Sequence, residues 1–133
     1  MRRAAFRKEE NLNLESLAYP SADKQFLQSI IDSIEQHFEE PKFDLEQLAA
    51  EKRMSQSTLY RKIKSMTGMT PLDFIRNIKM KRACMMLLSG SYNISEVAYA
   101  VGFSTPKYFS RCFKDEFGIT PSEYLQKHGG DGR

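Results

Sequence analysis

Residues 93–124 (NISEVAYAVGFSTPKYFSRCFKDEFGITPSEY) decide the fold of this 133-residue chain. The same pattern occurs earlier, over residues 44–74, as DLEQLAAEKRMSQSTLYRKIKSMTGMTPLDF. The two copies are offset by 49 residues at the front and by 50 at the back, so one extra residue sits near Thr105 and Pro106. An internal repeat of this length indicates a duplicated structural unit.

Each copy predicts two helices joined by a tight turn. Asp44 and Asn93 each stand three residues before a Gln or Glu, which is the spacing of a capping box at a helix N-terminus. Gly102 suits the left-handed residue that ends a helix. Arg53 takes that place in the earlier copy, where an L-residue costs about 1 kcal/mol or more. The earlier turn is therefore either strained or differently shaped.

The second helix of each copy has a polar start and an apolar stripe. Ser55 and Ser104 are the expected N-caps. Gly68 and Gly118 end these helices, and a Thr-Pro pair then begins a further helix in each copy. The expected buried residues are Leu59, Ile63 and Met66 in the earlier copy, and Phe109, Cys112, Phe113 and Phe117 in the later one.

One more helix precedes the repeat, and the helix that Thr70 and Pro71 begin is long. Ser21 is the expected N-cap of a helix in which Phe26, Ile30, Ile34 and Phe38 recur every four residues, with an acidic outer face. A long helix follows the earlier copy and is apolar on several sides, which is typical of a buried helix. Its expected buried residues are Phe74, Ile75, Ile78, Met80, Ala83, Met85 and Leu87.

No segment shows strand alternation, so the predicted fold is all-α, with about seven helices in two helix-turn-helix subdomains joined by a long central helix. Residues 1–20 are expected to be a tail or interdomain linker, and residues 21–128 the tandem domain. Within it we expect subdomain one over 21–70, the linking helix over 71–89 and subdomain two over 93–127. Residues 129–133 are expected to be a tail.

Positive charge is concentrated in the repeat. Residues 52–114 carry twelve basic side chains and only two acidic ones, a net charge of +10, whereas the rest of the chain carries −7 and the whole chain +3. Such a local excess attracts a polyanion. Arg76, Lys79 and Arg82 form a basic stripe on the long helix, which either contacts a nucleic-acid backbone or is simply solvated.

Several classes of protein are excluded. No stretch approaches 18 apolar residues, so we expect no membrane span. The basic start runs into Glu9 and Glu10 rather than an apolar segment, so we expect no secretory signal and a cytoplasmic location. Cys84 and Cys112 fit buried thiols, without metal-ligand spacing. No phosphate-binding loop or nucleophile motif is present. We therefore predict neither an enzyme nor a cofactor.

A tandem helix-turn-helix explains both the repeat and the charge. In this motif the second helix enters the major groove of double-stranded DNA and presents its N-terminal, outward residues to base edges, while capping residues and amides meet phosphates. The earlier copy offers Ser55, Gln56, Ser57, Tyr60, Arg61 and Lys64. The later copy offers Ser104, Thr105, Pro106, Lys107, Tyr108, Arg111 and Lys114.

The spacing of the copies suits DNA. A linking helix of about 17 residues is roughly 26 Å long at 1.5 Å per residue. With its neighbours it could place two reading helices roughly 34 Å apart, which is one turn of the duplex. Because the exposed residues of the two copies differ, we predict an asymmetric site rather than a palindrome.

These residues resemble a known family. The stretch from Asn93 to Lys114, followed by residues 117–124, is similar to the signature of the AraC/XylS family of bacterial transcription regulators, and residues 54–62 resemble its first motif. The resemblance covers about residues 24–126. It implies a seven-helix DNA-binding unit that recognises promoters and usually activates transcription through contact with RNA polymerase.

Residue roles follow from the resemblance by position. The base-reading candidates that it implies are Ser57, Tyr60, Arg61, Pro106, Lys107, Tyr108 and Arg111. Pro106 and Tyr108 fall where other members use polar readers, so base preference does not transfer. Arg53 replaces a more usual glycine.

The linker and the helix that begins near residue 21 also resemble the output end of hybrid two-component sensors of Bacteroidetes type. That resemblance implies receiver and kinase domains in a longer chain.

The competing interpretation is a helical adaptor that binds an acidic protein partner through a degenerate helix-turn-helix. The matched polar and basic sets of the two copies favour DNA, because an adaptor does not need them.

Overall fold

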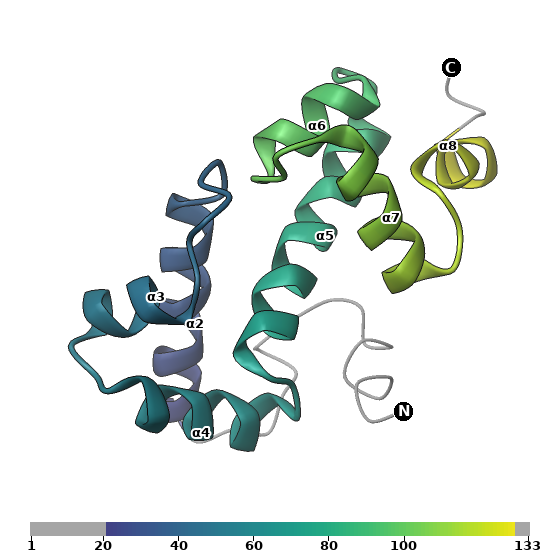
Figure 1. The fold of residues 1–133 in the computed structure, drawn as a ribbon. Coiled ribbons are helices and arrows are strands. Elements are labelled where there is room, and N and C mark those ends of the chain that lie inside the picture. Colours follow the sequence, from purple (N-terminus) through teal and green to yellow (C-terminus); the bar gives the residue numbers. More distant parts are fainter. Residues whose placement is uncertain (1–20, 130–133) are drawn as a thin grey trace. The chain divides into compact units, whose positions relative to one another are not determined.

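The computed structural model describes residues 21–129, and the expectations for residues 1–20 and 130–133 lie outside this range. The described residues form seven α-helices and one π-helical turn, without a strand. The elements are α2 (Ser21–Gln36), α3 (Leu45–Lys52), α4 (Gln56–Thr67), α5 (Pro71–Ser89), α6 (Ile94–Ala100), α7 (Pro106–Phe117), α8 (Pro121–Tyr124) and η2 (Leu125–Gly129) (Figure 1). The prediction of an all-α fold is confirmed.

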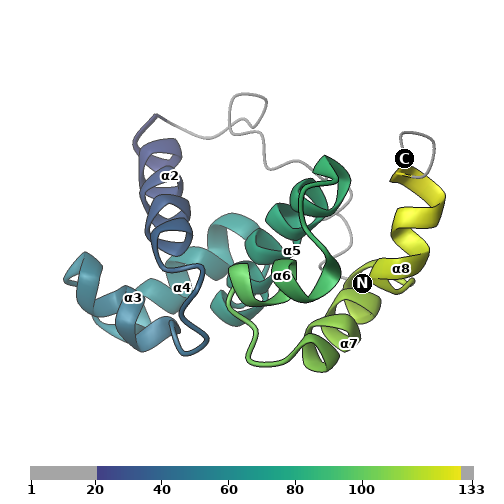
Figure 2. The same cartoon turned by 90° about the horizontal axis from the view of Figure 1, so that it is seen from above.

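The chain forms two compact units whose boundary falls inside α5. Among the described residues, the first unit comprises 21–37 and 43–78, and the second comprises 38–42 and 79–129. A short turn joins α3 to α4 in the first unit and α6 to α7 in the second (Figures 1 and 2). Each unit therefore contains one of the two helix pairs that the repeat predicts.

The helix α2 lies in the first unit with one apolar face inward. Ile30 and Ile34 are fully buried. Asp32 and Glu35 are exposed, as the acidic outer face predicts. Ser21, the expected N-cap, is itself helical. The amphipathic pattern thus placed the face of this helix correctly but misplaced its ends, since Ser21 is already helical and the helix ends at Gln36, before Phe38.

Both predicted capping boxes are present. Asp44 Oδ1 accepts a hydrogen bond from the Gln47 backbone N–H at 3.3 Å, and Gln47 Oε1 accepts one from the Asp44 N–H at 2.9 Å. Asn93 and Glu96 exchange the same two bonds at 2.8 and 2.9 Å. These bonds satisfy backbone donors that the first turn of a helix leaves without partners.

The turn after the first helix of each pair has the same hydrogen bonds in both copies. Met54 N–H donates to the Ala49 carbonyl, and Phe103 N–H donates to the Ala98 carbonyl, both at 2.9 Å. This bond across six residues requires a left-handed residue between its ends. Arg53 has φ 57° and Gly102 has φ 88°. The earlier turn is therefore strained rather than reshaped.

The extra residue of the later copy lies between this turn and α7. In the earlier copy, Ser55 caps α4 and accepts from the Thr58 N–H at 3.2 Å. In the later copy, the N-cap is Thr105, which accepts from the Tyr108 N–H at 3.1 Å. The prediction that Ser104 caps α7 is wrong, because Ser104 is the inserted residue and moves the cap one position further.

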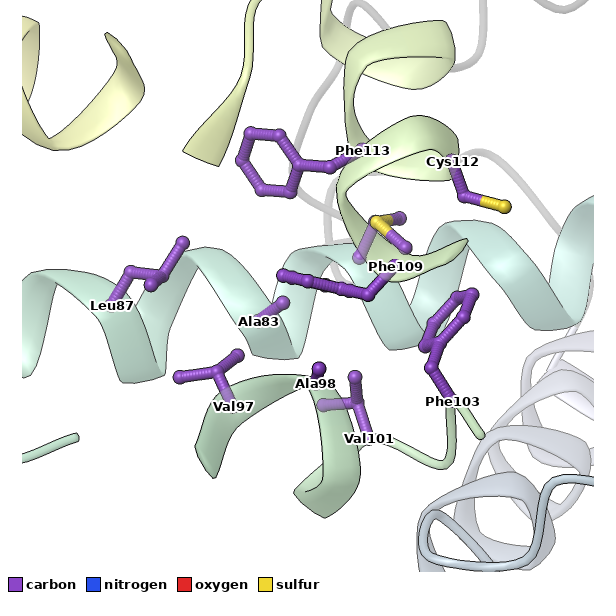
Figure 3. Close-up of a cluster of buried hydrophobic side chains, with 10 residues drawn as sticks. Ala83, Leu87, Val97, Ala98, Val101, Phe103, Phe109, Cys112 and Phe113 are labelled. Atoms are coloured by element: carbon purple, nitrogen blue, oxygen red, sulfur yellow. The ribbon is translucent and has the colours of Figure 1, made fainter. Parts of the chain in front are cut away.

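The core of the second unit is built around the phenylalanines of α7. Phe109 and Phe113 are fully buried. Figure 3 shows Phe109 pointing toward Ala83 on α5, with Ala98 on α6 beside it. These small residues leave room for the ring between the helices, since interiors are close-packed. The remaining core residues are Met80, Leu87, Val97, Val101, Phe103 and Cys112.

Some residues expected in the core lie partly outside it. Phe117 is 38% exposed at the last turn of α7, where its ring lies 4.6 Å from that of Phe113. Met85 is 66% exposed, although the other apolar residues predicted for the long helix are buried. Cys112 is buried, Cys84 is half-buried, and neither forms a disulfide bond.

Thr-Pro pairs begin α5 and α8, as predicted. Thr70 Oγ1 accepts from the Asp73 N–H at 3.2 Å. Thr120 Oγ1 accepts from the Glu123 N–H at 3.2 Å, and Glu123 Oε1 accepts from the Thr120 N–H at 2.8 Å. The backbone hydrogen bond from Thr120 lowers the pKa of Glu123 below its ordinary value of 4.5. None of the helices in residues 21–129 has the length and hydropathy that crossing a bilayer requires.

Candidate nucleic-acid interface

The helix α4 presents a polar face to solvent. Leu59 and Ile63 are fully buried on its inner side. All six site residues predicted for this copy are exposed; they are Ser55, Gln56, Ser57, Tyr60, Arg61 and Lys64. The five that belong to α4 recur at helical spacing and share the face opposite the core, whereas Ser55 is the N-cap. The structure brings this predicted set together within the first unit.

A shallow hollow of about 310 Å³ adjoins this face. Its lining consists of Leu45 from the start of α3 and Gln56, Ser57, Tyr60 and Arg61 from α4. Tyr60 is 40% exposed, so its ring belongs to the surface. The hollow combines an apolar wall with amide, hydroxyl and guanidinium groups, which are the groups that contact methyl and polar edges of bases.

The helix α7 presents the equivalent face in the second unit. Lys107, Tyr108, Arg111 and Lys114 are exposed, whereas Pro106 at the first helical position is half-buried. Thr105 and Ser104 are also exposed. The two helices have the same length of 12 residues, and their caps and ends are offset by the same number of positions.

The hydroxyl of each cap points to its own helix. Ser55 Oγ also donates to Thr58 Oγ1 at 2.9 Å. Thr105 Oγ1 accepts a hydrogen bond from the Tyr108 N–H at 3.1 Å. Beyond the caps, the exposed N-terminal amides of a helix form a site for anions, with the helix dipole adding to it.

Tyr108 and Arg111 lie against each other on α7. The guanidinium carbon of Arg111 is 5.8 Å from the centroid of the Tyr108 ring. The same ring lies 5.5 Å from the ring of Phe103, at an interplanar angle of 60°. Phe103 was not among the residues expected at the site. Phe103 lies in the turn before α7, and no sequence pattern predicts that its ring contacts Tyr108.

Several other basic residues lie against aromatic rings. Lys62 Nζ lies over the ring of Phe26 on α2, 4.7 Å from its centroid. Lys79 is only 7% exposed, with its Nζ 5.9 Å from the ring of Phe103. Lys79 is thus neither solvated nor free to reach a nucleic-acid backbone, in contrast to both expectations for the basic stripe.

The other two members of the stripe are half-buried. The guanidinium of Arg82 lies 5.1 Å from the ring of Phe38. Arg76 Nη1 lies 4.0 Å from Asp73 Oδ1. Within the stripe, Lys79 and Arg82 therefore lie against aromatic rings, and Arg76 lies beside an acidic side chain. Within residues 21–129, no three metal-binding side chains come together.

The sequence of this chain matches a protein family and several known proteins. A model of the helix-turn-helix domain family matches residues 48–127. The chain is 36% identical over 126 residues to histidine kinase P4 of Formosa agariphila, covering 95% of this chain and 9% of that protein. It is 39% identical over 90 residues to the HTH-type transcriptional activator RhaS of Mannheimia succiniciproducens, covering 68% of this chain and 33% of that protein. The chain thus spans well under two thirds of these curated relatives.

Solved structures with the same fold include DNA-binding proteins. A transcriptional regulator of Chromobacterium violaceum described as having an AraC-type DNA-binding domain superposes with a TM-score of 0.73 at 25% identity, over 84% of this chain and 98% of that one. The DNA-binding domain of AdpA in complex with a target DNA superposes with a TM-score of 0.69 at 30% identity, over 77% of this chain and 91% of that one.

Proposed function

Because the chain belongs to the AraC-type helix-turn-helix family of DNA-binding transcription regulators, we propose that α4 and α7 each enter a major groove of one promoter duplex. Sequence-specific DNA binding and transcription regulation are the function of this family. Family membership therefore favours DNA binding over the alternative function, a helical adaptor that binds an acidic protein partner.

One observation carries the proposal. Arg61 and Arg111 occupy the same position in helices of equal length, and both are exposed beside a buried stripe. An arginine fork pairs bidentately with guanine, and such a pair contributes about 1–3 kcal/mol of discrimination against a wrong base. The matched exposure supports one base-reading arginine in each unit.

The neighbouring residues take roles from their chemistry. Gln56 and Ser57 on α4 and Lys107 on α7 can hydrogen-bond base edges, and the Tyr60 ring can contact a thymine methyl. Lys64 and Lys114 stand further along their helices and suit phosphate contacts. The caps Ser55 and Thr105, with Ser104 beside the second, stand at helix N-termini where phosphates bind.

The two exposed sets differ, so the proposed site is asymmetric. Gln56 corresponds to Pro106 and Ser57 to Lys107. Units with different side chains at base-reading positions prefer different base pairs. A monomer would then read two unlike half-sites, roughly one turn of the duplex apart.

The proposal extends to partners beyond DNA. The match to a histidine kinase over 95% of this chain and 9% of that protein supports a place for this domain in a longer protein, where we propose that receiver and kinase domains accompany it. The match to a transcriptional activator supports activation of transcription, which we propose takes place through contact with RNA polymerase. Such a domain acts where promoter DNA lies, in the bacterial cytoplasm.

Fluorescence anisotropy tests the proposal. A duplex obtained by selection from random DNA is titrated with the 133-residue chain at several salt concentrations. We expect log K to fall with log salt with a slope of about −0.9 per phosphate contact, and the selected duplex to bind more tightly than a scrambled one. Equal affinity for both duplexes would contradict sequence-specific reading.

A further inference from the structure

Tyr108 joins the exposed face of α7 to the core of the second unit. Its ring contacts the ring of Phe103, with the centroids 5.5 Å apart, and Arg111 lies over it at 5.8 Å. Tyr108 itself is 42% exposed, so its ring forms part of the surface that carries Arg111.

The ring beneath Tyr108 is fixed in place. Phe103 is only 8% exposed and makes an edge-to-face contact with buried Phe109, with the centroids 5.4 Å apart (Figure 3). The buried ammonium of Lys79 approaches the same ring at 5.9 Å. Phe103 is thus held from more than one element, since Lys79 belongs to α5. A side chain that rests on it has a rigid support.

An arginine needs such a support to read a base efficiently. Its long side chain has many rotamers in the absence of DNA, and only a guanidinium fork of the correct orientation pairs bidentately with guanine. Stacking on an aromatic face restricts the guanidinium before DNA arrives, and restriction in the bound orientation lowers the cost of binding.

We propose that Tyr108 is a positioning residue, whose ring, supported by Phe103, orients the Arg111 guanidinium for base contact. This inference rests on the proposed function of α7. It changes the role predicted for Tyr108 from the sequence, because the ring acts through Arg111 and the phenolic hydroxyl reads no base.

The earlier copy lacks this arrangement. The residue that corresponds to Tyr108 is Thr58, and its hydroxyl bonds to the cap, Ser55, at 2.9 Å. A helix-turn-helix of this kind therefore folds without an aromatic ring at that position. The ring in the second unit is available for a role in reading DNA.

Four variants of the 133-residue chain test the proposal by anisotropy on the selected duplex and a scrambled duplex: Tyr108→Phe, Tyr108→Ala, Arg111→Ala and the double variant Tyr108→Ala/Arg111→Ala. Tyr92→Ala, in which a tyrosine that is 46% exposed is removed from a loop, serves as the matched control. Circular dichroism and thermal unfolding establish that each variant is folded.

We expect Arg111→Ala to weaken the selected duplex by about 10- to 100-fold. Tyr108→Ala should weaken binding of the selected duplex by most of that factor, whereas Tyr108→Phe should bind it like the wild type. The double variant should bind the selected duplex no more weakly than Arg111→Ala does. Affinity for the scrambled duplex should be unchanged by either tyrosine substitution.

Two results would overturn the positioning role while leaving DNA reading by α7 intact. One is a loss in Tyr108→Phe equal to that in Tyr108→Ala, which would assign the contact to the hydroxyl. The other is additive losses in the double variant, which would make the two residues independent. If Arg111→Ala binds both duplexes like the wild type, the proposed function of α7 fails together with the positioning role.

Discussion

The carbonyl oxygen of Phe38 lies so close to the Cα of Gly102 that a β-carbon on residue 102 would overlap it. Both residues belong to the second unit. Gly102 also has φ 88°, a backbone conformation that residues with a side chain rarely adopt. The turn between α6 and α7 thus needs glycine for its backbone angle and for the close approach of another part of the chain.

Gly102→Ala should therefore destabilise the second unit strongly. The left-handed angle alone costs about 1 kcal/mol, and displacing a backbone carbonyl adds to it, so we expect a loss of more than about 2 kcal/mol in the free energy of unfolding by urea. Gly118→Ala is the matched control, because Gly118 has φ 85° but open space around its Cα. Equal losses in the two variants would show that the contact with Phe38 is unimportant.

Arg53 adopts the same left-handed geometry in the earlier turn without being glycine. Arg53→Gly removes that strain but gives the unfolded chain more freedom, so we expect a net stabilisation of about 0.5–1 kcal/mol. Arg53→Ala keeps a β-carbon and should bring no gain. Urea unfolding of both variants measures the difference, and a gain in the alanine variant would mean that strain is not the cause.

The capping box at α8 should make stability depend on pH. Because the folded pKa of Glu123 is lowered, its carboxylate stabilises the protein above the unfolded value of 4.5, and this contribution is lost as pH falls through the folded pKa. The stability difference between wild type and Glu123→Gln should therefore shrink when urea unfolding is repeated at decreasing pH below 4.5. A difference that stays constant down to acidic pH would contradict the assignment.

Two neighbouring lysines on α4 should behave differently toward DNA. Both side chains are exposed, but the ammonium of Lys62 lies over the Phe26 ring, 4.7 Å from its centroid. Lys64→Ala should reduce the magnitude of the salt slope of DNA binding by about one phosphate contact. Lys62→Ala should leave the slope unchanged and instead reduce stability. Anisotropy at several salt concentrations separates them, and identical slopes for the two variants would count against this placement.

Much of this fold follows from local patterns in the sequence. The capping boxes, the glycines after α4 and α7 and the Thr-Pro starts are short motifs whose geometry depends on few neighbours, so the repeat predicts them well. The position of the inserted residue was not predictable to one place, because Ser104 and Thr105 are both good N-caps and only the length of the turn chooses between them.

Long-range contacts were the part that the sequence could not supply. Lys79 belongs to a basic stripe by spacing, yet it is buried beside Phe103, a residue that lies 24 positions later in the chain. The contact of Phe103 with Tyr108 likewise depends on how the turn folds back. The exposed faces of α4 and α7, by contrast, were predictable once the apolar stripes were removed.

Selection of binding sites from random duplex DNA with the wild type, Arg61→Ala and Arg111→Ala shows whether α4 and α7 read separate parts of one site. We expect an asymmetric consensus for the wild type. Each variant should lose base preference in a different part of that consensus, about 10 base pairs from the part that the other affects. A consensus that is a perfect inverted repeat, or the loss of the same base pairs in both variants, would contradict the reading of separate parts by α4 and α7.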